Sequence, residues 1–530
     1  MRTALDVARE ELAALGLHLN EGKTVVWARS GDCPPRCEAW WRGGDGFVIV
    51  GAPFGRLRDP GDLPAAEDDG GVDHDEREVA LGTPAFVQQF LQRQVTKVQD
   101  LVDRIVELPL LAGAHQPAVQ VANLLLRWCV QSKCIHLLRV LPPPQTAAFC
   151  TEVDALVLRA FCAINKCDPH FGEVQQCLYE TPLAWGGLGM RPLHAVRNAA
   201  YVGCWLQCLA HVRHAHGDMI CNFDTGWSGA GRAHSFHGEY RCALDALDAE
   251  LGTDQTAYGE LGFSLRDALQ AERPKCQKTL SRAVLGRRLQ AWKATLEPGC
   301  RALMVLAAAS SEGRRPLASQ WMTTTPFGSR TTIPDTAYRL AIHKRLGMPL
   351  CGRDDVCRVA KAGRVEDTDP RRPMPKRACG KLLRAHADHA QGCARAEVYA
   401  RHDAVAHLCA SIHGEVGHAV HTQSDVPGVL SNTKREPIRA DVLVREAPPG
   451  TWSCGEVKVR HVFTGDGDNV CAPASLDGML RAVEAEAHAH YRPVRVRPWV
   501  LTSFGRPGDE MSTDLRRLAR RRWLHRGRRK

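Results

Sequence analysis

Three side chains near the end of the chain, Asp441, Glu456 and Lys458, are of the types that hydrolyse phosphodiesters with the help of a metal ion. Carboxylate oxygens are preferred ligands of hard ions such as Mg²⁺ and Mn²⁺. Such an ion polarises a phosphate and lowers the pKa of a bound water, and a lysine ammonium stabilises the developing negative charge. We therefore predict a catalytic set of Asp441, Glu456 and Lys458 in which both carboxylates bind Mg²⁺ or Mn²⁺. The alternative is a solvated hairpin with ordinary surface charges, because this spacing occurs often by chance.

The sequence around these side chains predicts two strands joined by a turn. The residues around Asp441 and around Glu456 are rich in valine, and Ala447–Gly450 between them breaks the pattern with two prolines and a glycine. Side chains two positions apart on a strand share a face, so Glu456 and Lys458 point the same way. If the two strands pair antiparallel, Asp441 approaches Glu456, and the two carboxylates and the ammonium converge.

Cysteine and histidine residues upstream of these strands predict a structural zinc site. Thiolates and neutral imidazoles are zinc ligands, and closed structural sites use four of them. The predicted ligands are Cys357, Cys379, His389 and Cys393. Cys351 remains open as an alternative to Cys357, and His386 as an alternative to His389. The competing interpretation is a set of thiols and a surface histidine without metal.

The composition indicates an intracellular protein of several domains with an anionic partner. A length of 530 residues predicts about three domains, and an apolar fraction of 44% is ample for their cores. The formal net charge of +10 favours an anionic partner. The 21 cysteines are scattered singly, which indicates a reducing setting with mostly buried thiols. Residues 1–19 form an amphipathic pattern rather than a secretory signal, and no apolar run is long enough to span a bilayer.

Two segments near the N-terminus resemble the end of a reverse-transcriptase palm. The run Leu19–Thr24 resembles the fourth palm motif, and Gly46–Gly55 resembles the primer-grip segment. The resemblance implies that Lys23 lies near the phosphates of an incoming nucleotide; the alternative for Lys23 is a solvated turn. The aromatic-x-Asp-Asp motif of the polymerase precedes this region in the family, and the chain starts after it. Met1 therefore looks like a truncation or a gene-model start within a longer polyprotein, and we expect no polymerase activity.

The middle of the chain predicts helices that follow an acidic linker. Residues 58–82 are rich in Asp, Glu, Gly and Pro, as in a mobile linker. The Pro-x-x-x-Gly-Gly-Leu-Gly-x-Arg run at 182–191 resembles a signature of the thumb region in non-LTR retrotransposon polymerases. As bare sequence the same run predicts only a flexible turn. Residues 310–326 and 333–347 resemble the helical linker of the same elements.

The resemblance is most specific toward the C-terminus, where several motifs follow one another in a defined order. Cys-Gly-x₈-His-Ala-x₂-Cys at 379–393 precedes Arg401-His402-Asp403, and the strands of Asp441 and Glu456 come after them. This order resembles the restriction-like endonuclease domain of site-specific non-LTR retrotransposons, which belongs to the PD-(D/E)xK nuclease class. The resemblance implies an α/β fold for this domain and a structural Zn²⁺ in the knuckle before it.

Some positions depart from the family pattern. Asp403 stands where the family usually has Asn, and Ala440 where it usually has Pro. Glu456 stands where Asp is common. A family lysine expected shortly before Tyr491 is missing. Either Lys458 takes its role, as in the Glu-x-Lys form of the wider nuclease class, or the site has decayed.

The segment from Arg516 to Lys530 is strongly basic and contains one tryptophan. Clustered arginines neutralise phosphates and give salt-dependent binding that is independent of sequence, and an aromatic ring stacks on bases. The alternative is a disordered solubilising tail. The predicted nucleic-acid-binding residues are Lys23, Arg401, His402, Arg516, Arg517, Arg520, Arg521, Arg522 and Trp523.

In chain order, a multidomain protein of seven segments is expected, with a mostly helical middle. The segments are the palm end (1–57), an acidic linker (58–82), a helical thumb (83–215), a helical linker (216–345), a zinc knuckle (346–395), a restriction-endonuclease-like domain (396–510) and a basic tail (511–530). The resemblance implies a nuclear protein that nicks target DNA, so that the freed 3′-hydroxyl primes reverse transcription of the element's RNA. Target DNA and that RNA are the expected partners. The competing interpretation is a non-catalytic nucleic-acid-binding remnant.

Overall fold

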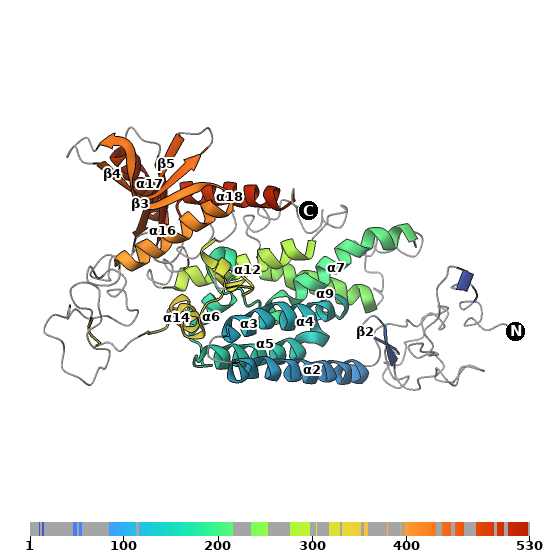
Figure 1. Cartoon of the computed structure of the whole chain (residues 1–530). Coiled ribbons are helices and arrows are strands. Elements are labelled where there is room, and N and C mark those ends of the chain that lie inside the picture. Colours follow the sequence, from blue (N-terminus) through green and yellow to red (C-terminus); the bar gives the residue numbers. More distant parts are fainter. Residues whose placement is uncertain are drawn as a thin grey trace, which may run out of the picture. The chain divides into compact units, whose positions relative to one another are not determined.

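A computed structural model gives the structure of the protein. The described residues are 10, 13–14, 46–49, 52–55, 84–112, 116–215, 235–252, 276–296, 304, 317–328, 331–350, 355–358, 379, 393, 398–430, 437–446, 451–460, 473–491, 496–502 and 507–527. Within them the chain is mostly helical, with a four-stranded mixed sheet toward the C-terminus (Figure 1). None of the helices in this part of the chain is both long and apolar enough to cross a membrane.

The chain divides into two compact units whose segments alternate along the sequence. The first comprises 1–107, 125–160 and 192–287, and the second comprises 108–124, 161–191 and 288–530. Four of the boundaries fall inside helices, namely α2 (Pro84–Leu111), α3 (Ala118–Leu125), α5 (Pro143–Asn165) and α12 (Cys276–Thr295). The division therefore differs from the seven consecutive segments expected from the sequence, because single helices contribute to both units.

The region before the sheet contains one short hairpin and a series of helices. The run that resembles a primer-grip segment contributes the antiparallel strands β1 (Gly46–Ile49) and β2 (Ala52–Gly55). The other helical elements are α3 (Ala118–Leu125), the π-helical η3 (Leu126–Val130), α4 (Gln131–Val140), α6 (Glu173–Glu180), the 3₁₀ turn η4 (Leu183–Trp185), α7 (Leu193–Ala215), α9 (Ser235–Leu251), α12 (Cys276–Thr295), the 3₁₀ segment η5 (Leu317–Met322) and α14 (Asp335–Arg345).

In the first unit, α7, α9 and α12 share one apolar core. Leu206, Leu247 and Leu280, one from each helix, are buried in it. Gly203 of α7 lies so close to α12 that a Cβ atom there would stand 2.6 Å from the Cα of Gln277. Absence of a side chain at this position therefore sets how closely the two helices approach.

In the second unit, the Gly-Gly-Leu-Gly run forms a tight turn after α6. Gly186 has φ of +95°, and a Cβ atom on it would lie 2.0 Å from the backbone oxygen of Met304. A Cβ atom on Gly187 would lie 2.1 Å from the backbone oxygen of Thr181. Only glycine combines that conformation with such close backbone contacts. The turn is thus fixed by packing, whereas the bare sequence predicts only a flexible turn.

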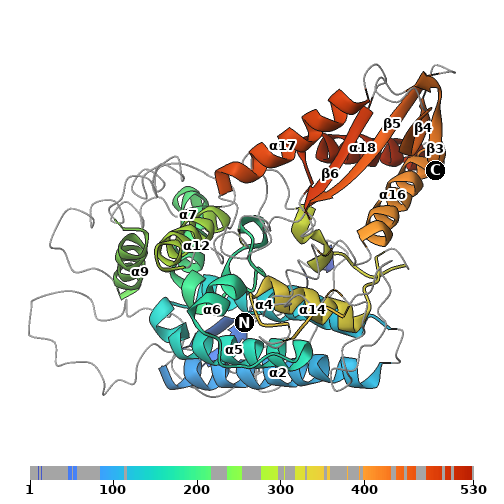
Figure 2. The same ribbon diagram turned by 90° about the vertical axis from the view of Figure 1, so that its left-hand side faces the viewer.

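The sheet has the strand order β3 (Ala419–Leu430), β4 (Pro437–Glu446), β5 (Thr451–Arg460) and β6 (Val496–Thr502). The first three strands pair antiparallel, whereas β6 runs parallel to β5. A parallel pair needs a crossover connection, and α17 (Pro473–His490) supplies it. Helix α16 (Val398–Glu415) precedes the sheet and α18 (Asp509–Gly527) follows it (Figure 2).

The two faces of the sheet carry different apolar clusters, because side chains alternate along each strand. The first face packs valines of β4 and β5, together with Trp499, against α16 and α18. The second cluster contains Leu443, Cys454 and Tyr491. Ile438, Ala440 and Leu443 of β4 all belong to this second cluster, so the alternation along β4 is interrupted beside Asp441.

Helix α18 packs on this sheet and is not a separate tail. Met511 and Leu518 are buried, and Leu515 packs against the same cluster as Trp499. The three apolar residues of α18 recur at helical spacing and so form one stripe. The expected boundary between 510 and 511 therefore falls inside a helix, and the arginines from 516 to 522 continue that helix instead of forming a disordered tail.

Candidate functional site

The strands that carry Asp441 and Glu456 are antiparallel neighbours, which confirms that prediction. Their last backbone pair joins Val442 to Gly455, so Asp441 and Glu456 each stand one residue beyond the end of the ladder. The two carboxylates therefore lie on adjacent strands, at the same end of the pairing.

The carboxylate of Asp441 is held by a neighbouring strand and by a helix. The backbone N–H of Val457 on β5 donates to its Oδ2 at 2.8 Å. The Nε2 atom of His402 on α16 lies 3.1 Å from the same oxygen. These contacts tie the beginning of β4 to β5 beyond their last backbone pair, and they bring α16 to the site.

His402 bridges two carboxylates, because its Nδ1 atom lies 3.1 Å from Oδ1 of Asp403. Burial alone would lower the pKa of His402, but the hydrogen bond with Asp403 and the charge of Asp441 outweigh burial and raise it. A raised pKa favours the imidazolium, which donates from both ring nitrogens. Helix α16 carries two of the predicted nucleic-acid-binding residues, Arg401 and His402. Both ring nitrogens of His402 are engaged by Asp403 and Asp441, and Arg401 beside it is half-buried.

Glu456 is 7% exposed, and each of its carboxylate oxygens has a partner. Lys458 places its Nζ 2.6 Å from Oε1, so the two side chains share a face as their spacing predicts. The hydroxyl of Tyr491 donates to Oε2. The sequence prediction does not include Tyr491, which is 35 residues away along the chain. One signal could have found it: a tyrosine that ends an amphipathic helix buries its ring and needs a partner for its hydroxyl.

These contacts form two polar groups at the end of the β4–β5 pairing. One consists of His402, Asp403 and Asp441, and the other of Glu456, Lys458 and Tyr491. The backbone N–H of Val457, next to Glu456, bonds Asp441. Hard oxygen donors with an excess of negative charge can bind a divalent cation. In the present arrangement, the ammonium of Lys458 balances the charge of Glu456.

The second predicted site has three of its ligands together. The sulfur atoms of Cys357, Cys379 and Cys393 lie within 4.8 Å of one another, and this cluster could hold a metal. The Cys357 and Cys393 sulfurs are 3.8 Å apart, much farther than the ~2 Å of a disulfide. Two sulfurs on a tetrahedral zinc with Zn–S bonds of about 2.3 Å are separated by about 3.8 Å. The predicted His389 and the alternative ligands lie outside the described residues.

A third polar cluster, which the sequence did not predict, joins α18 to the sheet. Asp514 accepts hydrogen bonds from Nε2 of His413 at 3.2 Å, from Nε1 of Trp499 at 3.1 Å and from Arg517 at 2.8 Å. Burial alone would raise the pKa of Asp514, but the hydrogen bond from His413 and the charge of Arg497 outweigh burial and lower it to about 2. Asp514 is thus ionised at neutral pH and serves as the shared acceptor of the cluster.

The cluster continues toward the surface through a pair of histidines. The Nδ1 atoms of His413 and His418 are 2.9 Å apart, and Arg521 lies 2.9 Å from Nε2 of His418. A guanidinium only donates and a carboxylate only accepts, so the hydrogen bonds run in one direction, from Arg521 through both rings to Asp514. In this direction, His418 accepts at Nε2 and donates from Nδ1, which fixes its tautomer. Burial, together with the charge of His413 and Arg521, lowers the pKa of His418 to about 4, which agrees with a neutral ring.

The same contacts divide the predicted nucleic-acid-binding residues of α18. Arg517 and Arg521 are engaged in the cluster and hold the helix on the sheet. Arg520 is exposed and Arg516 is half-buried, so both remain candidates for contact with phosphates. The predicted residues whose side chains lie outside the described set are Lys23, Arg522 and Trp523.

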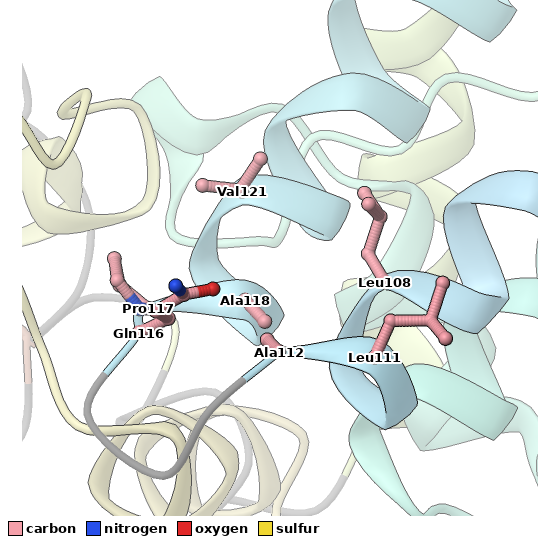
Figure 3. Close-up of a pocket in the computed structure, with 7 residues that line it drawn as sticks. All are labelled: Leu108, Leu111, Ala112, Gln116, Pro117, Ala118 and Val121. Carbon is pink, nitrogen blue, oxygen red and sulfur yellow. The ribbon is translucent and has the colours of Figure 1, made fainter.

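A cavity of about 320 Å³ lies between the end of α2 and the start of α3 (Figure 3). Its lining residues are Leu108, Leu111, Ala112, Gln116, Pro117, Ala118 and Val121. None of these side chains titrates, and Gln116 alone among them is polar. The described residues that line the cavity therefore offer no titratable groups for catalysis.

No protein-family model matches the sequence, and no curated protein matches it. A function for the chain therefore has to be argued from the chemistry of these clusters.

Proposed function

We propose that the protein is a metal-dependent nuclease that nicks DNA, with Asp441, Glu456 and Lys458 as its catalytic residues. The observation that carries the proposal is that the Asp441 carboxylate accepts at 2.8 Å from the backbone N–H of Val457, the residue between Glu456 and Lys458, while Lys458 lies 2.6 Å from Glu456. Cleavage of a phosphodiester needs an activated water and positive charge beside the phosphate, and these residue types supply both with a divalent ion.

The donor set fits one divalent ion such as Mg²⁺ or Mn²⁺. Asp441 and Glu456 offer hard carboxylate oxygens from adjacent strands, and in the described part of the chain both contacts of Asp441 use Oδ2, which leaves Oδ1 toward an ion. Such an ion, when bound, supplies Lewis acidity and a water of lowered pKa. Lys458 is 36% exposed and long, so its ammonium is able to turn from Glu456 to a phosphate oxygen.

The cysteine cluster supports a structural Zn²⁺ knuckle upstream of the nuclease. Its sulfur spacing of 3.8 Å suits two thiolates on one tetrahedral ion. His389 is the fourth ligand in this proposal. Exposed arginines of α18, such as Arg520, supply the sequence-independent attraction to the DNA backbone.

We place the chain within a non-LTR retrotransposon polyprotein of the nucleus. Target DNA and the element's RNA are its partners, and the nick supplies the 3′-hydroxyl that primes reverse transcription. The order of the motifs from 379 to 459 supports this part of the proposal.

A nucleic-acid-binding remnant without catalysis is the second candidate function. One observation favours it: Lys458 and Tyr491 occupy both oxygens of Glu456, so an ion has to compete with partners that are already bonded. In this alternative, the two polar groups are a structural substitute for a lost metal site, and the arginines of α18 provide all of the function.

Nicking of a supercoiled plasmid by the full-length protein, with Mg²⁺ or Mn²⁺, separates the two functions. Asp441→Asn removes a ligand charge with little change in shape, so nicking should fall by more than the 10- to 100-fold typical of losing an outer-shell partner. Asp425→Asn on the exposed part of β3 is the matched control and should nick like wild type. Equal nicking by wild type and Asp441→Asn would place the activity elsewhere, and DNA binding without any nicking would favour the remnant.

A further inference from the structure

Tyr491 contacts both strands that carry the candidate carboxylates. It follows α17, where its N–H bonds the carbonyl of Ala487 at 3.1 Å, and only 3% of the residue is exposed. Its hydroxyl donates to Oε2 of Glu456 on β5. The Tyr491 hydroxyl oxygen also lies 3.2 Å from the carbonyl oxygen of Arg439 on β4. One side chain therefore spans from one strand to the other.

The strands need such a connection because their pairing ends at this point. The β4–β5 ladder stops at Val442 and Gly455. Beyond this last pair, Arg439 of β4 still pairs with β3, and Glu456 of β5 still pairs with β6. The residue opposite Glu456 on β6 is Pro498, which has no N–H to donate. The two strands form a fork, and the Tyr491 hydroxyl lies in it.

The hydroxyl is suited to hold Glu456 rather than the carbonyl. A phenol has one hydrogen, and a charged acceptor makes the shorter and stronger bond. A tyrosine phenol has an ordinary pKa of about 10, so the hydroxyl carries its proton at neutral pH. The Tyr491 hydroxyl is thus a donor at neutral pH, directed at one carboxylate oxygen of Glu456.

We propose that Tyr491 is a positioning residue of the nuclease site: it fixes the Glu456 carboxylate across the fork, so that Glu456 and Asp441 present their oxygens to one divalent ion. This inference rests on the proposed nuclease function. Tyr491 touches neither the phosphate nor the ion in this role, because its hydroxyl occupies Oε2 and leaves Oε1, now paired with Lys458, for the ion.

The test compares Mn²⁺ binding and nicking by full-length wild type and Tyr491→Phe. Phenylalanine keeps the buried ring and removes only the hydroxyl. We expect the Kd for Mn²⁺, measured by calorimetry or by electron paramagnetic resonance, to rise about 10- to 100-fold. Nicking at saturating Mn²⁺ should recover toward the wild-type rate, since the catalytic groups are intact. Tyr240→Phe, a buried tyrosine of α9, is the control and should bind Mn²⁺ like wild type.

A second variant shows whether the effect passes through Glu456. In a Glu456→Gln background the charged acceptor is gone, so adding Tyr491→Phe should change the Kd for Mn²⁺ by less than about twofold; additive losses would overturn the positioning role. Unchanged Mn²⁺ binding by Tyr491→Phe, with Asp441-dependent binding in wild type, would overturn the inference alone. Absence of Mn²⁺ binding and nicking in wild type would overturn the proposed nuclease as well.

Discussion

Replacement of Asp514 by asparagine tests whether the buried cluster fastens α18 to the sheet. The Asp514 side chain is 9% exposed and meets His413, Trp499, Arg517 and, at 3.5 Å, Arg497. Asparagine keeps nearly the same shape but carries no charge. The Arg497 side chain, also 9% exposed, then loses its carboxylate partner in a site that water barely reaches.

Two arguments give the size of the expected loss. Removal of one partner from a buried ion pair costs about 3–5 kcal/mol, because the other charge stays buried. The pKa of Asp514 near 2, against a usual value of 3.8, corresponds to about 2–3 kcal/mol of stability at neutral pH. We therefore expect Asp514→Asn to lose about 3 kcal/mol. For a region of this size, such a loss lowers the unfolding midpoint by roughly 10 °C.

The loss depends on pH in a defined direction. A carboxyl with a depressed pKa stabilises the folded state at pH values above its usual pKa, 3.8, and this contribution disappears as the pH falls through about 2. Wild type and Asp514→Asn should therefore differ fully at pH 7. Their stabilities should converge as the medium is acidified from about pH 4 to pH 2.

Thermal unfolding of the full-length protein, with hydrogen exchange of α18 peptides to locate the change, measures this effect. The control is Asp509→Asn, an exposed carboxylate at the start of the same helix, which should cost no more than about 1 kcal/mol. Faster exchange in α18 of Asp514→Asn, but not of the control, is expected. Equal midpoints of wild type and Asp514→Asn at pH 7 would refute the argument that this cluster anchors α18.

Three other predictions concern the remaining clusters. The pKa of His418 is lowered from its usual value of 6.5, so its contribution to stability is present above pH 6.5 and is lost as the pH falls to about 4. Glutamine does not titrate, so His418→Gln should flatten the pH dependence of the unfolding midpoint between these two pH values. Cys393→Ser should remove zinc from the purified protein, as metal analysis would show, whereas the buried sheet thiol in Cys454→Ser should not; equal zinc in both would exclude the knuckle. Leu518→Ala should destabilise α18 by about 2–5 kcal/mol in urea unfolding, because it removes a buried side chain. Replacement of its exposed neighbour in Arg520→Gln should instead weaken DNA binding and reduce the salt slope of binding by about one unit, with little change in stability. An unchanged salt slope would exclude Arg520 from the interface.

The sequence predicts the parts of the candidate site that follow from local rules. Asp441 and Glu456 come together because a short turn between two valine-rich segments favours an antiparallel pair. Glu456 and Lys458 share a face because strand side chains alternate with a period of two. These rules need no information from distant parts of the chain.

The rest depends on contacts between residues far apart in sequence. His402 reaches Asp441 across 39 residues, and Tyr491 reaches Glu456 across 35. No local pattern states how α16 and α17 lie on the sheet. The basic character of the last segment also concealed the apolar stripe of Leu515 and Leu518, because charge dominated its composition while packing determined its structure.

Both local and distant contacts hold the candidate carboxylates at the fork between β4 and β5. Within a ladder, backbone hydrogen bonds fix the strand spacing; beyond Val442 and Gly455 nothing in the backbone does so for Asp441 and Glu456. The Val457 amide and Tyr491 take over that task from outside the ladder. A carboxylate pair released from backbone pairing is able to close on an ion, provided that side chains limit its freedom. In the proposed nuclease, loss of the Tyr491 contact should weaken ion binding with Asp441 and Glu456 still in place, so an active site and a decayed one would differ in the support of the carboxylates and not in the carboxylates themselves.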